Sequence, residues 1–340
     1  MTLKMAFAGF RHGHILGLYR GAVSRDDVEV VAAADEHRPT RQKLAADKTV
    51  AFTHDSYERM LSDVDFDVLA VGEYYGGRGE LAIRALESGR HVLADKPLCT
   101  RMGELERIAE LAEDAGLSVG CMLTMRESGN FVALRQLIEA GRIGQVHTID
   151  FQGQHPLLRG SRPGWYFQPD GQGGTINDIA IHAMDAIPWM TGRRIVEVVA
   201  ARAWNARLAD PDWFQDGAQM MLRLDNGGGV LGDVSYLTPD SHAYKVGVYW
   251  RYTLHGGEGV AETSSTAKGV TVSVNGGKLN EHVPPAPGRD GAHLADFLAE
   301  IRGEPTPPEA LTTRQVLAAS RRALLAQKAA DEGLFGVACE

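Results

Sequence analysis

The chain has 340 residues, of which 44% are hydrophobic and 23% are charged. That is enough apolar material for two hydrophobic cores, so we expect two domains. The net charge of -9, without any run rich in lysine or arginine, argues against a broad nucleic-acid-binding face. The three cysteines, Cys99, Cys121 and Cys339, are scattered and odd in number, which argues against a disulfide framework or a zinc knuckle.

The amino-terminal residues indicate where the protein works. Residues 1–9 have the pattern of a β-strand and lack the apolar core and cleavage site of a secretory signal. No stretch approaches the roughly 20 apolar residues needed to span a bilayer. We therefore expect a soluble, cytoplasmic protein.

Strands and helices alternate along the first third of the chain. This rhythm, with strands that are apolar throughout, predicts a doubly wound parallel sheet with a nucleotide site at its carboxyl edge. The expected strands are Leu3–Ala8, Val28–Ala33, Phe66–Val71, His91–Ala94 and Ser118–Met122. The expected helices are Ile15–Ser24, Arg38–Asp47, Gly77–Glu87 and Arg101–Ala115.

The second half changes to long alternating runs, which predict a largely antiparallel sheet. The expected strands are Val146–Gln154, Val196–Trp204, Ala218–Leu224, Val230–Leu237 and Tyr244–His255. One helix, Thr175–Met190, is too little cover for such a sheet, so we predict a homodimer or homotetramer that packs sheet to sheet. A final helix, Thr312–Glu332, is expected to pack on the first domain.

The turn after the first strand partly matches a dinucleotide-binding fingerprint. Gly9 can make the tight turn, but Arg11 and His14 stand where the second and third glycines belong. The turn follows a strand and opens a helix, whose amino end favours phosphate, and Asp35 ends the next strand. An acid there favours NAD, although Arg38 nearby keeps NADP as an alternative.

Two segments about eighty residues apart carry reactive groups: Asp95-Lys96-Pro97 ends a strand, and Gly173-Gly174 precedes the helix that carries Asp178 and His182. Because Lys96 precedes proline, its backbone is extended and its ammonium is expected at the carboxyl edge of the sheet. The alternative is an ordinary solvated lysine.

Asp178 and His182 are four residues apart, so a helix places them on one face. An imidazole suits proton transfer near neutral pH. Asp178 could instead complete a capping box with Thr175. His182 could be a buried structural histidine, with Asp185 orienting it.

The order of these motifs resembles that of the glucose-fructose oxidoreductase, inositol dehydrogenase and rhizopine-catabolism (Gfo/Idh/MocA) family. Other parts of the resemblance are Met122–Arg126, Trp165, Leu254–Gly259 and Ala295–Gly303, with Asp95 standing where the family usually has glutamate. The resemblance implies a Rossmann domain (residues 1–125), an α+β domain with an open-faced sheet (126–311) and a carboxy-terminal helical segment (312–340).

The resemblance also implies NAD(P)-dependent oxidation of a secondary hydroxyl on a sugar or cyclitol. His182 would be the general base, Asp178 would hold the substrate or tune His182, and Lys96 would stabilise the developing oxyanion. The residues expected at the cofactor are Gly9, Phe10, Arg11, His12, His14, Asp35, Arg38, Gly72, Glu73, Lys96 and Pro97. Those expected at the substrate are Tyr75, Lys96, Arg126, His155, Arg162, Trp165, Asp178 and His182, with Tyr166 a further candidate.

Several alternatives stay open. Trp165 and Tyr166 can equally be packing residues, because Trp and Tyr are often buried. A metal site built from His12, His14, His155 and His182 lacks a recognised ligand spacing, so we predict none. The function could also be that of an NAD-requiring glycosidase acting by transient oxidation, or of a nucleotide-binding sensor without turnover.

Overall fold

The computed structural model describes residues 2–208 and 214–339, and its chain divides into two compact units. Unit 1 comprises the stretch up to Met122, Pro163–Gly173 and Gly291–Leu317; unit 2 comprises the rest. This division differs from the three consecutive segments that we expected, because the chain returns to unit 1 twice. The last helix is also shared: α9 (Thr313–Glu332) begins in unit 1, but most of it belongs to unit 2.

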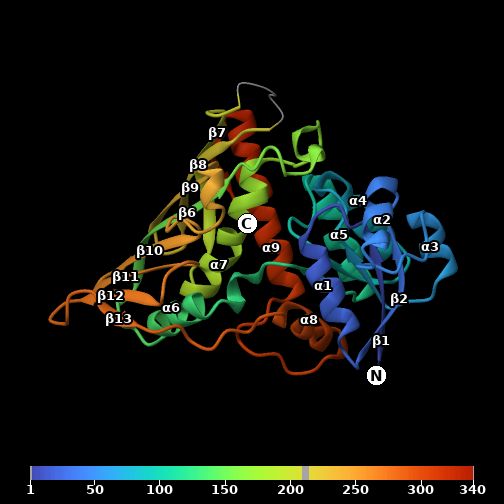
Figure 1. The fold of residues 1–340 in the computed structure, drawn as a ribbon. Helices are drawn as coiled ribbons and strands as arrows, with labels where there is room; N and C mark the ends of the chain where they lie inside the picture. The colour runs from blue at the N-terminus through green and yellow to red at the C-terminus, as the bar shows by residue number, and fades with distance from the viewer. Residues whose placement is uncertain (1, 209–213, 340) are drawn as a thin grey trace. The chain divides into compact units, whose positions relative to one another are not determined.

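Unit 1 contains a five-stranded parallel sheet in the order β2-β1-β3-β4-β5, which confirms the predicted doubly wound fold (Figure 1). The strands are β1 (Leu3–Ala8), β2 (Val28–Ala34), β3 (Val68–Val71), β4 (His91–Ala94) and β5 (Val119–Cys121). The helices are α1 (His14–Val23), α2 (Arg38–Ala46), α3 (Tyr57–Asp63), α4 (Tyr75–Glu87), α5 (Met102–Ala115) and α8 (Ala292–Arg302).

The core of unit 1 joins its first turn to a distant helix. Phe10 packs against Tyr19 and Phe52, with ring centroids 5.7 and 5.2 Å apart. Leu294 and Phe297 of α8 are buried in the same cluster. The turn after β1 is therefore anchored by a buried aromatic side chain, which fixes the backbone on which a nucleotide would lie.

Unit 2 contains a nine-stranded sheet in the order β13-β12-β11-β10-β6-β9-β8-β7-β14, antiparallel except for the β6–β9 pair. The strands are β6 (Val146–Pro156), β7 (Ile195–Trp204), β8 (Gly217–Leu224), β9 (Gly229–Thr238), β10 (Arg251–Gly256), β11 (Gly259–Ser264), β12 (Val270–Val274), β13 (Glu281–Val283) and β14 (Phe335–Ala338). The helices of unit 2 are α6 (Gly129–Glu139), the π-helix Ile176–Ala180, α7 (Ile181–Thr191) and most of α9. Unit 2 also has short 3₁₀ turns at Thr124–Glu127 and Asp240–His242, and unit 1 has one at Gly164–Phe167.

The predicted single strand over Tyr244–His255 is wrong at its first half. Ala243 and Trp250 have positive φ angles, 47° and 50°, which interrupt an extended strand. The strand β10 therefore starts only at Arg251, and the residues before it form turns. Among the described residues, no helix is both long and apolar enough to cross a bilayer.

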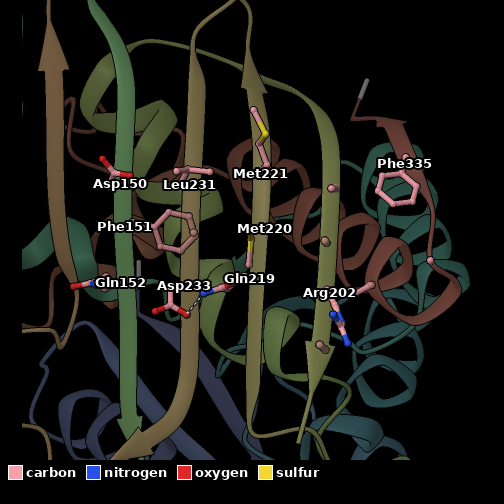
Figure 2. A pocket seen from close by; sticks show the side chains of 16 residues that line it. Asp150, Phe151, Gln152, Arg202, Gln219, Met220, Met221, Leu231, Asp233 and Phe335 are labelled. Carbon is pink, nitrogen blue, oxygen red and sulfur yellow. Dashed lines mark hydrogen bonds between the residues drawn. The ribbon is translucent and has the colours of Figure 1, made fainter. Parts of the chain in front are cut away.

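More helices cover the large sheet than we expected. Figure 1 shows α7 and the greater part of α9 running beside the strands of unit 2. Arg322 of α9 donates a hydrogen bond to the carbonyl of Met184 in α7, at 3.2 Å, which ties these two helices together. The opposite face of the sheet is the one seen in Figure 2.

Candidate active site

The turn after β1 packs so closely against the end of β3 that it requires glycine on both sides. Gly9 has a φ of 81°, and a Cβ there would lie 2.6 Å from the backbone of Glu73. A Cβ on Gly72 would lie 2.6 Å from the carbonyl oxygen of Gly9. Glycine is therefore needed on both sides of this turn, because any side chain would push the ends of β1 and β3 apart.

Asp35 supports the same turn from the end of β2. Its carboxylate accepts hydrogen bonds from the backbone N–H of Phe10 at 2.7 Å and of His37 at 2.8 Å. Burial and the nearby Glu73 carboxylate raise the pKa of Asp35 to about 6, against the opposing effect of these hydrogen bonds. Each carboxylate oxygen keeps a second lone pair, which is what a ribose hydroxyl would need. Arg38 lies exposed on α2, three residues beyond Asp35.

Arg11 replaces the expected second glycine, and its side chain turns toward β3. Its guanidinium lies 3.4 Å from Glu73 and 5.0 Å from the ring centroid of Tyr74. Its carbonyl accepts a hydrogen bond from the indole of Trp165 at 3.3 Å. In the described part of the chain no side chain caps the amino end of α1. The amides of this helix end are thus of the kind that binds an anion.

Arg78, which the sequence analysis did not single out, holds the turn at Lys96. Its fully buried guanidinium donates to Asp95 at 3.0 Å, to the carbonyl of Glu73 at 2.8 Å, and to the carbonyl of Lys96. Lys96 itself is buried, and its ammonium nitrogen lies 5.4 Å from the ring centroid of Tyr75. The solvated-lysine alternative is therefore wrong.

A chain of hydrogen bonds leads away from Asp95. His12 Nδ1 lies 2.5 Å from the Asp95 carboxylate, His12 Nε2 lies 3.2 Å from the hydroxyl of Tyr75, and that hydroxyl lies 2.6 Å from the hydroxyl of Tyr166. Burial lowers the pKa of His12 to about 4, although Asp95 opposes the shift. Burial raises the pKa of Asp95, but Arg78 and His12 outweigh this and hold it well below its usual value.

In unit 2 the helix that carries Asp178 begins with a π-helical turn, Ile176–Ala180. Such turns occur often at functional sites. Gly174 leads into it with a φ of 95°, and a Cβ there would collide with Gln327 of α9. The carbonyl oxygen of the Gln327 side chain accepts the N–H of Ile176 at 2.9 Å and of Asn177 at 3.4 Å.

The capping-box alternative for Asp178 is wrong. Thr175 donates its hydroxyl to the carbonyl of Gln215, and the carboxylate of Asp178 accepts a hydrogen bond from the hydroxyl of Tyr236 on β9. Asp178 is buried and is held by a side chain from the sheet. The neutral hydroxyl of Tyr236 therefore helps to fix the position of the Asp178 carboxylate.

His182 lies in an aromatic group with another predicted residue. Its ring centroid is 4.9 Å from that of Trp250, which is 5.2 Å from His155. His155 is 6.0 Å from Tyr236, and the guanidinium of Arg162 lies 4.9 Å from the ring centroid of Tyr236. Four predicted residues, Asp178, His182, His155 and Arg162, are therefore linked through Tyr236 and Trp250.

Tyr236 and Trp250 are not among the site residues that the sequence predicts. Tyr236 lies in a strand that was correctly predicted, but alternation alone does not separate a packing tyrosine from a functional one. Trp250 lies in the segment that was mistaken for continuous strand, and its φ of 50° is what the alternating pattern could not reveal.

Arg126, which we expect at the substrate, has a buried structural partner in unit 2. Its guanidinium donates to both oxygens of Asp185, one of these bonds being 2.9 Å long, and both side chains are buried. This pair also accounts for Asp185, which we had considered as a partner of His182. We therefore leave Arg126 out of the proposed site.

The remaining candidates divide between the units. Tyr75 and Trp165 belong to unit 1, where their rings are 4.9 Å apart, and Pro97 belongs to the turn that Arg78 holds. Of the four histidines in the metal-site alternative, His12 and His14 lie in unit 1 beside Asp95, and the other two lie in unit 2.

Two family models match the chain. Residues 4–122 match the model described as an oxidoreductase family with an NAD-binding Rossmann fold, and residues 131–262 match the Gfo/Idh/MocA C-terminal domain. The chain belongs to the Gfo/Idh/MocA oxidoreductase family. Its unit 1 sheet is the NAD-binding Rossmann fold of that family, and the predicted resemblance is confirmed.

Curated relatives are distant. Inositol 2-dehydrogenase 2 of Saccharopolyspora erythraea is 28% identical over 231 residues, 66% of this chain and 63% of that protein. The 1,5-anhydro-D-fructose reductase of Ensifer adhaerens is 25% identical over 61% of this chain and 62% of its own length. The alignments thus span somewhat less than two thirds of these two relatives.

Solved structures cover nearly the whole chain. A putative oxidoreductase from Erwinia carotovora atroseptica has a TM-score of 0.85 at 25% identity, covering 97% of this chain and 99% of that one. The WlbA dehydrogenase of Bordetella pertussis, solved with NADH and UDP-GlcNAcA, has a TM-score of 0.78 at 20% identity, covering 99% of each chain. At 20% identity, the match to the WlbA dehydrogenase shows that the two chains share a fold.

Proposed function

We propose that this protein is an NAD-dependent dehydrogenase that oxidises, reversibly, a secondary hydroxyl of a sugar or cyclitol. The proposal rests on a group of side chains in unit 2. This group contains a buried carboxylate, Asp178, and an imidazole, His182, which are linked through Tyr236 and Trp250. The other unit of the same chain is an NAD-binding Rossmann fold.

The residues of unit 1 fit the dinucleotide. Gly9 and Gly72 allow the ends of β1 and β3 to pack closely at the turn. The amino end of α1 would receive the pyrophosphate, and Asp35 would accept hydrogen bonds from the ribose hydroxyls. The bound dinucleotide supplies the chemistry of a two-electron acceptor at nicotinamide C4. Asp35 favours NAD, while the exposed Arg38 keeps NADP as the second cofactor to test.

In the proposed reaction His182 takes the proton of the substrate hydroxyl as general base. Asp178, fixed by Tyr236, accepts a hydrogen bond from a substrate hydroxyl and favours the protonated imidazole. Lys96 stabilises negative charge on the reacting oxygen, because its ammonium is held at the end of β4 by the contacts of Arg78 with the same turn.

The substrate class follows from the chemistry of the unit 2 group and from the relatives. Aromatic rings interleaved with hydrogen-bonding groups suit a polyhydroxylated ring, whose faces are apolar and whose edge is polar. His155 and Arg162 are the proposed hydroxyl-binding residues of this group. Several relatives are inositol dehydrogenases or a sugar reductase, which supports a cyclitol or sugar.

The test is a panel of sugars and cyclitols, with NAD and NADP in parallel, followed by the absorbance of reduced nicotinamide. Net formation of NADH with at least one polyol is the expected result. Cleavage of an aryl glycoside without net NADH would indicate the glycosidase instead. Tight binding of NAD without turnover on any member would indicate the sensor, and either outcome would overturn the proposal.

We also propose that the protein is a homodimer or homotetramer formed through the open face of the large sheet. Figure 2 shows this face, where residues of β6 to β9 and β14 line a depression of about 750 Å³. Met221, Leu231 and Phe335 are 47%, 53% and 80% exposed on it. Charges of both signs, Arg202 and Asp233, lie on the same face, so two copies related by a twofold axis could pair them.

A further inference from the structure

Three side chains that can bind a metal ion meet in unit 1, beside the turn that the proposed function assigns to the dinucleotide. His12 lies in the turn after β1, His14 opens α1, and Asp95 follows β4. Their ligand atoms all lie within 4.8 Å of one another. His12 Nδ1 is 2.5 Å and His14 Nδ1 is 3.2 Å from the carboxylate of Asp95. The two imidazole centroids are 4.3 Å apart.

These distances suit one ion. Two atoms bound to the same Zn²⁺ at about 2.1 Å, with a tetrahedral angle between them, lie about 3.4 Å apart. The separation between His14 Nδ1 and Asp95 is close to this value. The shorter His12–Asp95 contact is a hydrogen bond that an ion would replace, so this pair would have to open by about 1 Å.

The residues behind the three ligands are those expected around a metal site. His12 Nε2 lies 3.2 Å from the hydroxyl of Tyr75, so its second nitrogen has a partner that fixes the ring. The guanidinium of Arg78 donates to Asp95 Oδ2, the oxygen that His12 also contacts, while Oδ1 faces His14. Such outer partners orient ligands and tune their affinity.

The group is also reachable from solvent. The Asp95 side chain is fully buried and that of His12 is 13% exposed, but that of His14 is 54% exposed. Two ligands are therefore fixed in the interior while the third lies at the surface. An ion can enter past His14, and its remaining coordination positions can be filled by water or by another oxygen ligand.

We propose that His12, His14 and Asp95 form a binding site for one divalent transition-metal ion of the Zn²⁺ class. Two imidazoles and one carboxylate are a ligand set that such ions favour over Mg²⁺ or Ca²⁺, which prefer oxygen ligands alone. The ion would join the turn after β1 to the Asp95-Lys96-Pro97 turn. The site would give a role to His14, which stands where a dinucleotide-binding fingerprint usually has its third glycine.

The test is titration of the full, untagged chain with Co²⁺, followed by its visible absorption, and with Zn²⁺, followed by equilibrium dialysis and elemental analysis. About one ion per chain is expected. His14→Ala should weaken binding roughly a hundredfold or more, since it removes a ligand rather than an outer partner. Because His14 is half exposed, this variant is expected to fold.

His37→Ala is the matched control, because His37 is an exposed histidine of the same unit outside the group. It should bind the ion as the wild type does. A second readout is the melting temperature, which Zn²⁺ should raise in the wild type and in His37→Ala but not in His14→Ala. Wild-type protein that binds no ion, or His14→Ala that binds it as tightly as the wild type, would overturn the proposal.

Discussion

Arg78 shows how one buried side chain can determine the shape of the turn at Lys96. It pairs with Asp95, and it donates hydrogen bonds to the main chain after β3, at Glu73, and after β4, at Lys96. A sequence does not show this role, since an arginine in an amphipathic helix is usually solvated. The pairing depends on β3 and β4 ending side by side, which is a property of the sheet.

Replacing Arg78 with methionine should lower the free energy of unfolding by about 3 to 5 kcal/mol, because it leaves the buried Asp95 carboxylate without its charged partner. Urea unfolding measures this loss. Arg84→Met, on the same helix but in an exposed pair with Glu80, should cost less than about 1 kcal/mol. A loss at Arg78 as small as that at Arg84 would contradict the assigned role.

Asp35 predicts a pH dependence of cofactor binding. Its pKa in the folded chain is raised to about 6, so it takes up a proton as the pH falls through that value. If NAD needs the ionised carboxylate, its dissociation constant should rise roughly tenfold for each pH unit below about 6 and stay flat above it. The dissociation constant can be measured by titrating the protein with NAD at several pH values between about 5 and 7 and following the protein fluorescence.

One variant of Asp35 and one of its neighbour Glu73 serve as controls. Asp35→Asn should bind NAD more weakly and without the rise at low pH. Glu73→Gln should move the rise to lower pH, because the Glu73 carboxylate is one cause of the raised pKa of Asp35. A dissociation constant for wild type that does not change between pH 5 and pH 7 would contradict the role of Asp35.

At the scale of elements, the helix that carries Asp178 and His182 depends on α9. Gln327 is buried and accepts the first N–H groups of the π-helical turn. Gln327→Leu keeps the volume but removes the acceptor, so it should cost about 1 to 2 kcal/mol of unfolding free energy. It should also lower kcat more than it raises the NAD dissociation constant, because the cofactor turn is in the other unit.

Lys328→Leu, at the exposed neighbouring position, is the control and should leave both stability and kcat near wild type. If Gln327→Leu matches Lys328→Leu in kcat and in urea unfolding, the helix does not depend on this contact.

Most elements of unit 1 followed directly from the sequence. Its strands are apolar throughout because helices cover both faces, and the bounds of β1 and β4 agree with the prediction. The Asp178–His182 spacing also placed both residues on one helix. Spacing could not give the partners that come from distant parts of the chain: Tyr236 on β9 for Asp178, and Trp250, in the turn before β10, for His182. The π-helical turn was likewise hidden, since its apolar pattern is that of any buried helix.

At the scale of the whole molecule, the open sheet face is the feature that a single chain leaves unexplained. Soluble monomers rarely expose broad apolar patches, and this sheet face exposes Met221, Leu231 and Phe335 together. The double variant Met221→Asp, Leu231→Asp should convert the proposed oligomer to monomer, because four carboxylates would meet across a twofold axis. Light scattering on a sizing column measures the mass.

Leu279→Asp is the matched control for this test. Leu279 is 84% exposed but lies outside the sheet-face depression, so its substitution should not change the mass. A wild-type mass equal to that of one chain at micromolar concentration would contradict the proposed assembly.

The proposed reaction requires both Lys96 and His182, which come from different segments of the chain. The most direct test is the rate of NADH formation by wild type, Lys96→Ala and His182→Ala on a polyol that the wild type oxidises, with NAD binding measured in parallel. We predict that each variant binds NAD but turns over about a hundredfold more slowly or worse. Near wild-type turnover by either variant would contradict the account.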